Sequence, residues 1–148
     1  MKRTILMAAI GASLTIATVA WARNTFLDIP VAEAKKSERS NQLKDVPFYM
    51  KGESHPKVAR ELGTFTSNRR TNAFNKSDRD ACHIAFLSAV IALQERARSE
   101  GGNAVVDIRS ITRHNDLDSR DQYRCVAGAV VANVVLTGRV VELAGKKK

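Results

Sequence analysis

The chain has 148 residues, and its 24 lysines and arginines against 15 aspartates and glutamates give a formal net charge of +9 at neutral pH. This length suits one domain and excludes two separate hydrophobic cores. The positive charge favours anionic partners, which are nucleic acid in the cytosol and lipid headgroups, lipopolysaccharide or acidic glycans outside it. A basic surface that only improves solubility would give the same charge.

The first 22 residues have the layout of a secretory signal peptide. A positive start at Lys2 and Arg3 precedes an apolar run without charge over residues 4–19, and residues 20–22 (Ala-Trp-Ala) place small side chains where a signal peptidase requires them. The run is about long enough for a retained anchor, but its polar residues and cleavage site favour removal. Cleavage after Ala22 removes two cations and no acid, which leaves a soluble, periplasmic protein of 126 residues with a net charge of +7.

The mature chain is predicted to consist of an arm, one domain and a tail. Residues 23–45 have apolar side chains only at intervals and a strongly polar stretch over residues 34–42, which is typical of a loose N-terminal arm or an exposed helical turn. Residues 46–145 are predicted to form a single α+β domain. Residues 146–148 are three lysines, and we expect them to be a disordered basic tail.

Two extended segments are predicted at the start of the domain. The apolar patch over residues 46–50 contains Pro47, which keeps the preceding residue extended and suits an edge strand. Imperfect alternation over residues 58–67 predicts a second strand, with the odd and even positions on opposite faces. The polar and basic stretch over residues 68–76 is predicted to be a loop.

A helix over residues 78–99 has the clearest signals. Ser77 is a suitable N-cap, Asp80 occupies the place of a capping-box acid, and a Gly-Gly pair after the helix favours its end. Apolar residues form two stripes around its circumference, so the helix must be covered on two sides. We expect a sheet to cover one side and the patch over residues 46–50 to cover the other.

Two β-rich segments follow the helix. Residues 103–111 alternate and predict a strand, and residues 123–143 form a long β-rich run that Gly128 and Gly138 interrupt as bulges or bends. The order strand, helix, strand, strand predicts an α+β fold, namely a small antiparallel-rich sheet with one long helix packed on one face.

The two cysteines are predicted to meet. Cys82 lies at the start of the helix, and the short turn after the helix makes the strand over residues 103–111 return to the level of Cys82. A hairpin from that strand would then start the last β run, with Cys125, at the same end of the domain. In an exported chain this predicts a structural disulfide. A thiol activated by the helix N-terminus and a pair of buried free thiols are the alternatives.

Four basic residues lie close in sequence to the start of the helix. Together with the helix N-terminus they form a possible anion-binding site, and ordinary loop charge is the other interpretation. They are Arg69, Arg70, Lys76 and Arg79.

An acidic loop near residue 116 offers oxygen ligands for a hard cation. It contains His114, Asp116, Asp118 and Asp121, but it lacks the glycine and the distal glutamate of an EF-hand loop, and nearby arginines offset its charge. The chain contains no recognisable nucleophile motif, zinc-protease motif or phosphate loop. We therefore predict no catalytic residue, no cofactor and no metal ligand.

Several segments resemble a family of small exported proteobacterial proteins. The resemblance covers nearly the whole mature chain, and its segments are Gly63–Asn68, Thr71–Asp78, Ala81–Cys82, Ala92–Ala97, Gly101–Val106 and Cys125–Gly128. Members often carry the automated name "excinuclease ATPase subunit", which is a misnomer for a small exported chain without a phosphate loop. The family is uncharacterised, so the resemblance implies no catalytic residue.

The helix followed by Gly-Gly-Asn-Ala-Val-Val is also similar to an element of YbjQ-like domains and of the outer-membrane sensor lipoprotein of the Rcs envelope-stress pathway. That sensor is disulfide-bonded, which agrees with the pairing argued above. We expect a non-catalytic binding or envelope-stress accessory protein whose partner is an envelope protein or an anionic envelope component, not nucleic acid. The alternatives are a nucleic-acid- or ATP-related protein, as the family label suggests, and a metal- or redox-responsive protein.

Overall fold

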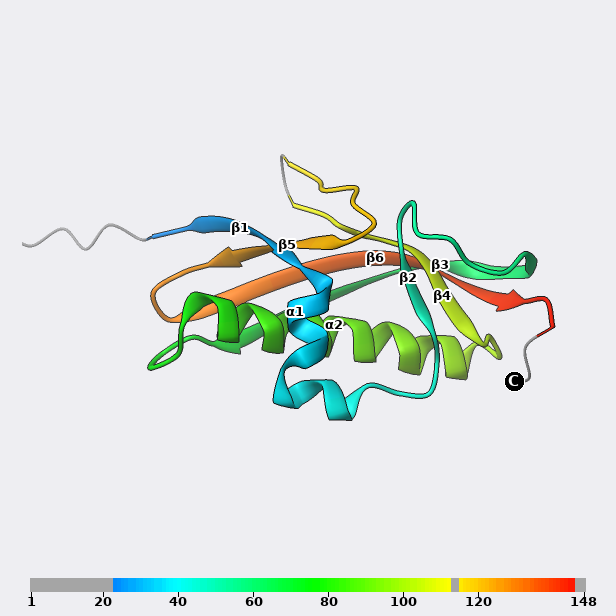
Figure 1. Cartoon of the computed structure of the whole chain (residues 1–148), viewed down its shortest axis with the longest axis horizontal. Coiled ribbons are helices and arrows are strands. Elements are labelled where there is room, and N and C mark those ends of the chain that lie inside the picture. Colours follow the sequence, from blue (N-terminus) through cyan, green and yellow to red (C-terminus); the bar gives the residue numbers. More distant parts are fainter. Residues whose placement is uncertain (1–22, 113–114, 146–148) are drawn as a thin grey trace, which may run out of the picture.

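The computed structural model describes residues 23–112 and 115–145, so the predicted signal peptide, His114 and the predicted basic tail lie outside it. Figure 1 shows one long helix below a curved sheet, with a short helical segment beside the helix. The elements in chain order are β1 (Thr25–Pro30), α1 (Val31–Lys36), the 3₁₀ helix η1 (Glu38–Gln42), β2 (Phe48–Met50), β3 (Val58–Asn72), α2 (Asp78–Ser99), β4 (Ala104–Ser110), β5 (Gln122–Ala127) and β6 (Val131–Leu143).

The sheet is built around β6, which is long enough to pair with three strands. β3 runs antiparallel along one edge of β6, from the Asn72–Val131 pair to the Val58–Leu143 pair. On the other edge, β5 pairs with the start of β6 and β4 pairs with its second half. β1 extends the sheet beyond β5, and β2 extends it beyond β4 in the one parallel pairing among the described strands. The predicted α+β fold, an antiparallel-rich sheet with one long helix on one face, is confirmed.

Helix α2 has the bounds that its capping signals predict. The Ser77 hydroxyl accepts a hydrogen bond from the backbone N–H of Asp80 at 3.0 Å, and after the last turn Gly102 donates to the carbonyl of Ala97 at 2.8 Å. The helix packs on alternate residues of β6. Gly138 of β6 leaves room for the neighbouring side chains of β4, since a Cβ atom there would lie 2.9 Å from Val105 and 3.1 Å from Ile108.

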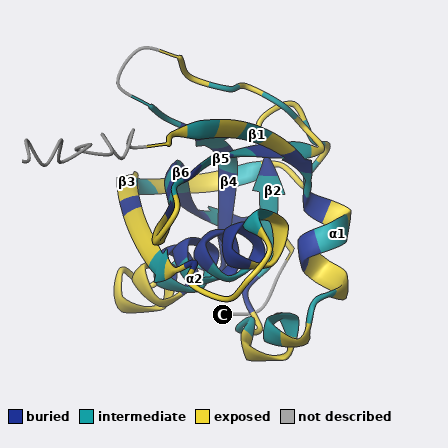
Figure 2. Ribbon diagram, turned by 90° about the vertical axis from the view of Figure 1, so that its left-hand side faces the viewer, coloured by how far each residue is buried: buried dark blue, intermediate teal, exposed yellow. Residues whose placement is uncertain are grey.

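The side of α2 away from the sheet is covered by the segment before β2 together with α1 and η1. The fully buried side chain of Gln94 accepts a hydrogen bond from the Lys44 N–H at 2.9 Å and donates to the Val46 carbonyl at 2.7 Å. Figure 2 shows α2 end on, dark blue where the sheet and α1 enclose it. Residues 46–50, which were predicted to cover this side of α2, therefore provide only part of its cover.

The prediction of a loose arm over residues 23–45 is wrong, whereas the alternative of an exposed helical turn in residues 34–42 agrees with η1, which has no buried residue. Residues 25–30 form β1, paired antiparallel with β5 over six residue pairs, and Ile29 is fully buried. α1 then buries Val31 and Ala34 against the same core. The strand is short and its outward-facing side includes the exposed Phe26 and Asp28, so its local pattern is ambiguous, and its antiparallel pairing with β5 specifies it.

Three further predictions need correction. Residues 68–72 are not loop but the end of β3, because pairing with β6 outweighs their polar composition. Gly63, at φ +128°, lies at a register shift in β3, so odd and even positions do not keep their faces along the strand as predicted. The expected hairpin from residues 103–111 is also absent, since β5 pairs with β1 and β6 in its place.

Candidate functional site

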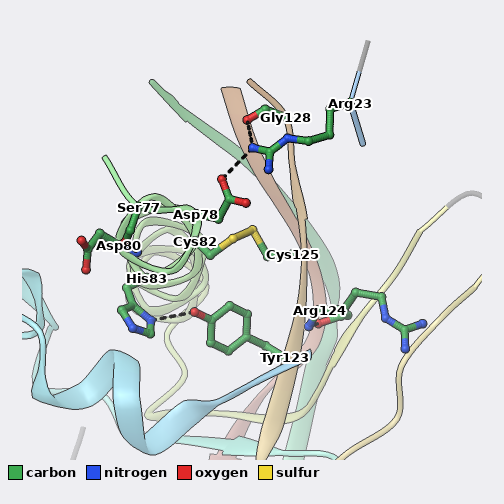
Figure 3. The surroundings of a disulfide bond; sticks show 11 residues. Arg23, Ser77, Asp78, Asp80, Cys82, His83, Tyr123, Arg124, Cys125 and Gly128 are labelled. Atoms are coloured by element: carbon green, nitrogen blue, oxygen red, sulfur yellow. Dashed lines mark hydrogen bonds and ion pairs between the residues drawn. A yellow bond between two sulfur atoms is a disulfide. The ribbon is translucent and has the colours of Figure 1, made fainter. Parts of the chain in front are cut away.

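The disulfide joins the first turns of α2 to β5. Cys82 and Cys125 are bonded, their Cα atoms are 5.8 Å apart, and both residues are fully buried. In Figure 3, Cys125 and Tyr123 extend from β5 toward the helix, whereas Arg124 extends from the other side of the strand. The predicted pairing is confirmed, and it places the cysteines out of reach of solvent.

A buried pair of polar side chains, which the sequence did not indicate, lies beside the disulfide. The Nδ1 atom of His83 is 2.9 Å from the hydroxyl of Tyr123, whose ring stacks on Phe86 with centroids 4.0 Å apart. Burial lowers the pKa of His83 and raises the pKa of Tyr123, so both groups are held neutral. Only the position of His83 next to Cys82 in the sequence could have indicated this pair.

A groove of about 640 Å³ runs between η1 and the first half of α2. Its charged lining consists of Lys36, Glu38, Arg39 and Asp80, and His83 also lines it. At its α1 end Arg79 makes a two-point ion pair with Glu33 at 2.8 and 3.1 Å, and that hydrogen bond lowers the pKa of Glu33. Cations and anions thus balance along the groove, which gives it no preference for a charged ligand.

The four basic residues of the predicted anion site do not lie together in the structure. Arg79 faces α1, where Glu33 holds it. Arg69 pairs with Val134, which faces α2, whereas Arg70 pairs with Asn133 on the outer face of the sheet, so the two arginines lie on opposite faces. Arg69, Arg70 and Lys76 are all exposed, and no carboxylate within residues 23–112 and 115–145 forms an ion pair with them. The four residues therefore do not converge on one anion, but three of them surround the same end of the domain.

That end is the most distinctive surface of the molecule, and we call it the β5–β6 end. It consists of the start of β1 (residues 23–26), the turn after β3 (residues 72–76) and the turn between β5 and β6 (residues 128–131). Figure 2 looks onto it, and Figure 1 shows it at the left. Every exposed large apolar side chain in the described residues belongs to it, namely Phe26, Phe74, Val130 and Val131.

Hydrogen bonds and one ion pair hold the turns of the β5–β6 end in place. The Ala73 N–H donates to the Val130 carbonyl at 2.7 Å, and the Phe74 N–H donates to the Asn72 side chain at 2.8 Å. Arg23 pairs with Asp78 at 2.9 Å and also donates to the Gly128 carbonyl at 3.4 Å, as Figure 3 shows. A phenylalanine among polar loop residues was the one signal in the sequence that pointed to this surface.

The three carboxylates of the acidic loop take different partners. Asp118 pairs with Lys51 at 2.8 Å and Arg109 at 3.4 Å, and the Lys51 ammonium lowers the pKa of Asp118. Asp116 accepts a backbone N–H, and Asp121 accepts a serine hydroxyl. In the part of the chain that the structure describes, no three His, Cys, Asp or Glu side chains lie close enough to hold a metal ion. The loop is thus organised by salt bridges and local hydrogen bonds.

Comparison of the chain with protein-family models, with curated proteins and with solved structures finds no significant match. None of the helices in the described ranges is long and apolar enough to cross a membrane. The candidate site therefore has to be interpreted from its own geometry, and the β5–β6 end is the surface whose composition departs most from that of an ordinary protein surface.

Proposed function

We propose that this protein is exported to the periplasm and works there as a binding protein without catalytic activity, with an anionic component of the cell envelope as its partner. The observation that carries the proposal is the β5–β6 end, where exposed Arg69, Arg70 and Lys76 surround exposed apolar side chains. Cations without carboxylate partners keep their full charge for a ligand, whereas the charge of Arg79, beside the groove, is offset by Glu33.

Export is supported by two independent features of the chain. Residues 1–22 have the composition of a signal peptide, and the buried Cys82–Cys125 disulfide suits an oxidising compartment. Outside the cytoplasm, nucleic acid is not the polyanion that a basic protein meets, so lipid headgroups, lipopolysaccharide and acidic glycans are the candidate partners.

Intact-mass measurement of the protein from a periplasmic extract tests the location. We expect a chain that begins at Arg23 and takes up a thiol-alkylating reagent only after reduction. A chain of full length with two free thiols would place the protein in a reducing compartment and overturn the proposal.

Retention on immobilised heparin, a soluble polyanion, tests the binding surface. We expect elution at clearly lower salt for Arg69→Glu/Arg70→Glu than for wild type, because exposed charges interact through screened forces. Lys57→Glu/Arg98→Glu is the matched control, since it makes the same change in net charge with exposed residues at the other end of the domain. Equal loss of retention in both variants would mean that only the net charge matters.

A further inference from the structure

We propose that the β5–β6 end docks on the surface of a bilayer that contains anionic phospholipid, with Phe74, Val130 and Val131 entering its interfacial layer. This inference rests on the function proposed above and names the partner. It uses both halves of the surface, since the cations account for attraction to headgroups and the apolar side chains account for contact with the lipid beneath them.

The exposed large apolar side chains are unusual because they gather at the β5–β6 end. Phe74, Val130, Phe26 and Val131 are 63%, 60%, 54% and 43% exposed, and no other large apolar side chain in residues 23–112 and 115–145 is exposed. Exposed apolar residues on a monomeric protein are normally scattered singly, whereas these gather at one end of the molecule. A water-soluble polyanion would make no favourable contact with these apolar side chains, whereas a bilayer interface would bury them.

The basic half lies around the same patch. Arg70 lines a hollow with Phe74 and Val131, and Lys76 follows two residues after Phe74 in the same turn. The nearby carboxylate of Asp78 is already paired with Arg23. Each lysine or arginine near an anionic membrane surface adds to binding, and the effect falls off within a Debye length, so cations at the rim of the patch act at the right distance.

The path of the chain brings the same end to a membrane. The predicted apolar leader, residues 1–22, joins the domain at Arg23, and Arg23 contacts the β5–β6 turn through the Gly128 carbonyl. While the leader lies in the inner membrane, this is the end of the domain next to the bilayer. After cleavage, the new α-ammonium group at residue 23 adds another positive charge there.

Vesicle sedimentation tests the inference with protein purified from a periplasmic extract. We expect sedimentation with vesicles that contain phosphatidylglycerol and not with vesicles of phosphatidylcholine alone, and weaker binding as salt is raised. Phe74→Ala/Val130→Ala should lower the apparent affinity by about tenfold or more, because it removes two side chains that the interface buries. Both side chains are exposed, so circular dichroism and thermal unfolding should stay unchanged.

The charge reversals used above separate docking by this end from general attraction. Arg69→Glu/Arg70→Glu should lose vesicle binding, whereas Lys57→Glu/Arg98→Glu should retain most of it. Equal losses in the two variants, or full binding by Phe74→Ala/Val130→Ala, would overturn docking through the β5–β6 end.

A tryptophan probe reports insertion directly. The one tryptophan of the chain, Trp21, lies in the predicted leader, so Phe74→Trp gives the mature protein a single fluorophore. We expect its emission to shift to shorter wavelength on phosphatidylglycerol vesicles, and we expect no shift for Ser54→Trp, which is exposed at the opposite end of β3. A matching shift at both positions, or at neither, would contradict the proposed orientation.

The heparin measurement distinguishes this inference from the proposed function. Retention on heparin that depends on Arg69 and Arg70, without vesicle binding, would overturn the bilayer as the partner and leave the proposed function intact. If the protein neither binds heparin nor binds vesicles, both this inference and the proposed function are overturned. Vesicle binding that depends on Phe74 as well as on the arginines supports the inference.

Discussion

Two side-chain pairs tie the first turns of α2 to β5, and they are neighbours in sequence as well as in space. Cys82 is bonded to Cys125, and His83 contacts the hydroxyl of Tyr123. One pair is covalent and independent of pH, whereas the other changes with protonation. The two contributions to stability can therefore be measured separately.

Replacement of both cysteines by serine should lower the free energy of unfolding by about 4 kcal/mol, because the bridge closes a loop with a sequence separation of 43 residues in the unfolded chain. Urea denaturation of the double variant, and of wild type with and without reductant, checks the value. A wild type that is equally stable when reduced would contradict a structural role for the disulfide.

His83 should make stability depend on pH. Its folded pKa is lowered, mainly because burial disfavours the imidazolium, while the nearby Glu33 carboxylate opposes this shift. A group whose pKa is lower in the folded state stabilises fully above its unfolded pKa of 6.5, and this stabilisation is lost as the pH falls below that value. Urea denaturation at pH 7.5 and 5.5 should show a smaller loss on acidification for His83→Gln than for wild type, with His55→Gln as the control.

At the scale of elements, Gln94 connects α2 to the segment before β2. Its amide accepts from the Lys44 N–H and donates to the carbonyls of Lys44 and Val46. A polar residue on a buried helix face is costly unless all its hydrogen bonds are made, and here they are made to a segment without regular structure. Gln94 thus supplies the partners that a strand would otherwise provide.

Gln94→Leu should therefore destabilise the protein by about 2 kcal/mol, because it leaves buried backbone groups without partners while keeping the volume nearly constant. Chemical denaturation measures the loss, and hydrogen exchange should show faster exchange of the Lys44 amide in the variant. An unchanged exchange rate at Lys44 would mean that the segment is held by other contacts.

The sequence predicted those elements whose signals are local. Helix α2 has its cap at Ser77 and its stop at a Gly-Gly pair. The cysteine pairing was predicted from the antiparallel arrangement of α2 and β4 together with a β4–β5 hairpin, and the pairing is present although that hairpin is not. β1 and the last five residues of β3 were missed because long-range pairing with β5 and β6 specifies them. At the site, nearness in sequence suggested one cluster for Arg69 and Arg70, but strand alternation places them on opposite faces.

For the whole molecule, the N-terminal strand is part of the core and not an appendage. Ile29, Val31 and Ala34 are buried, and the Asp28–Arg124 ion pair, at 2.6 and 2.7 Å, joins β1 to β5 on the outer face. The Arg124 guanidinium lowers the pKa of Asp28. The folding unit thus includes β1, α1 and the segment before β2 as well as residues 46–143.

A chain of residues 46–145 should consequently fail to fold, whereas residues 23–145 should unfold cooperatively. Burial of Ile29 and Val31 alone is worth about 4 kcal/mol, which is a large share of the stability of a small domain. Near-ultraviolet circular dichroism and cooperative thermal unfolding distinguish the outcomes. Cooperative unfolding of the shorter chain would contradict this division of the core.

β3 is the longest strand, and its outer edge has no neighbour among the described strands. Gly63, at φ +128°, bends this edge at the register shift, and the edge carries charged side chains such as Arg60 and Arg69. A straight, apolar edge would act as a template for strand addition by a second copy, and a bent, charged edge resists it. We therefore expect the protein to remain free of fibrils at high concentration, as a dye specific for amyloid would report.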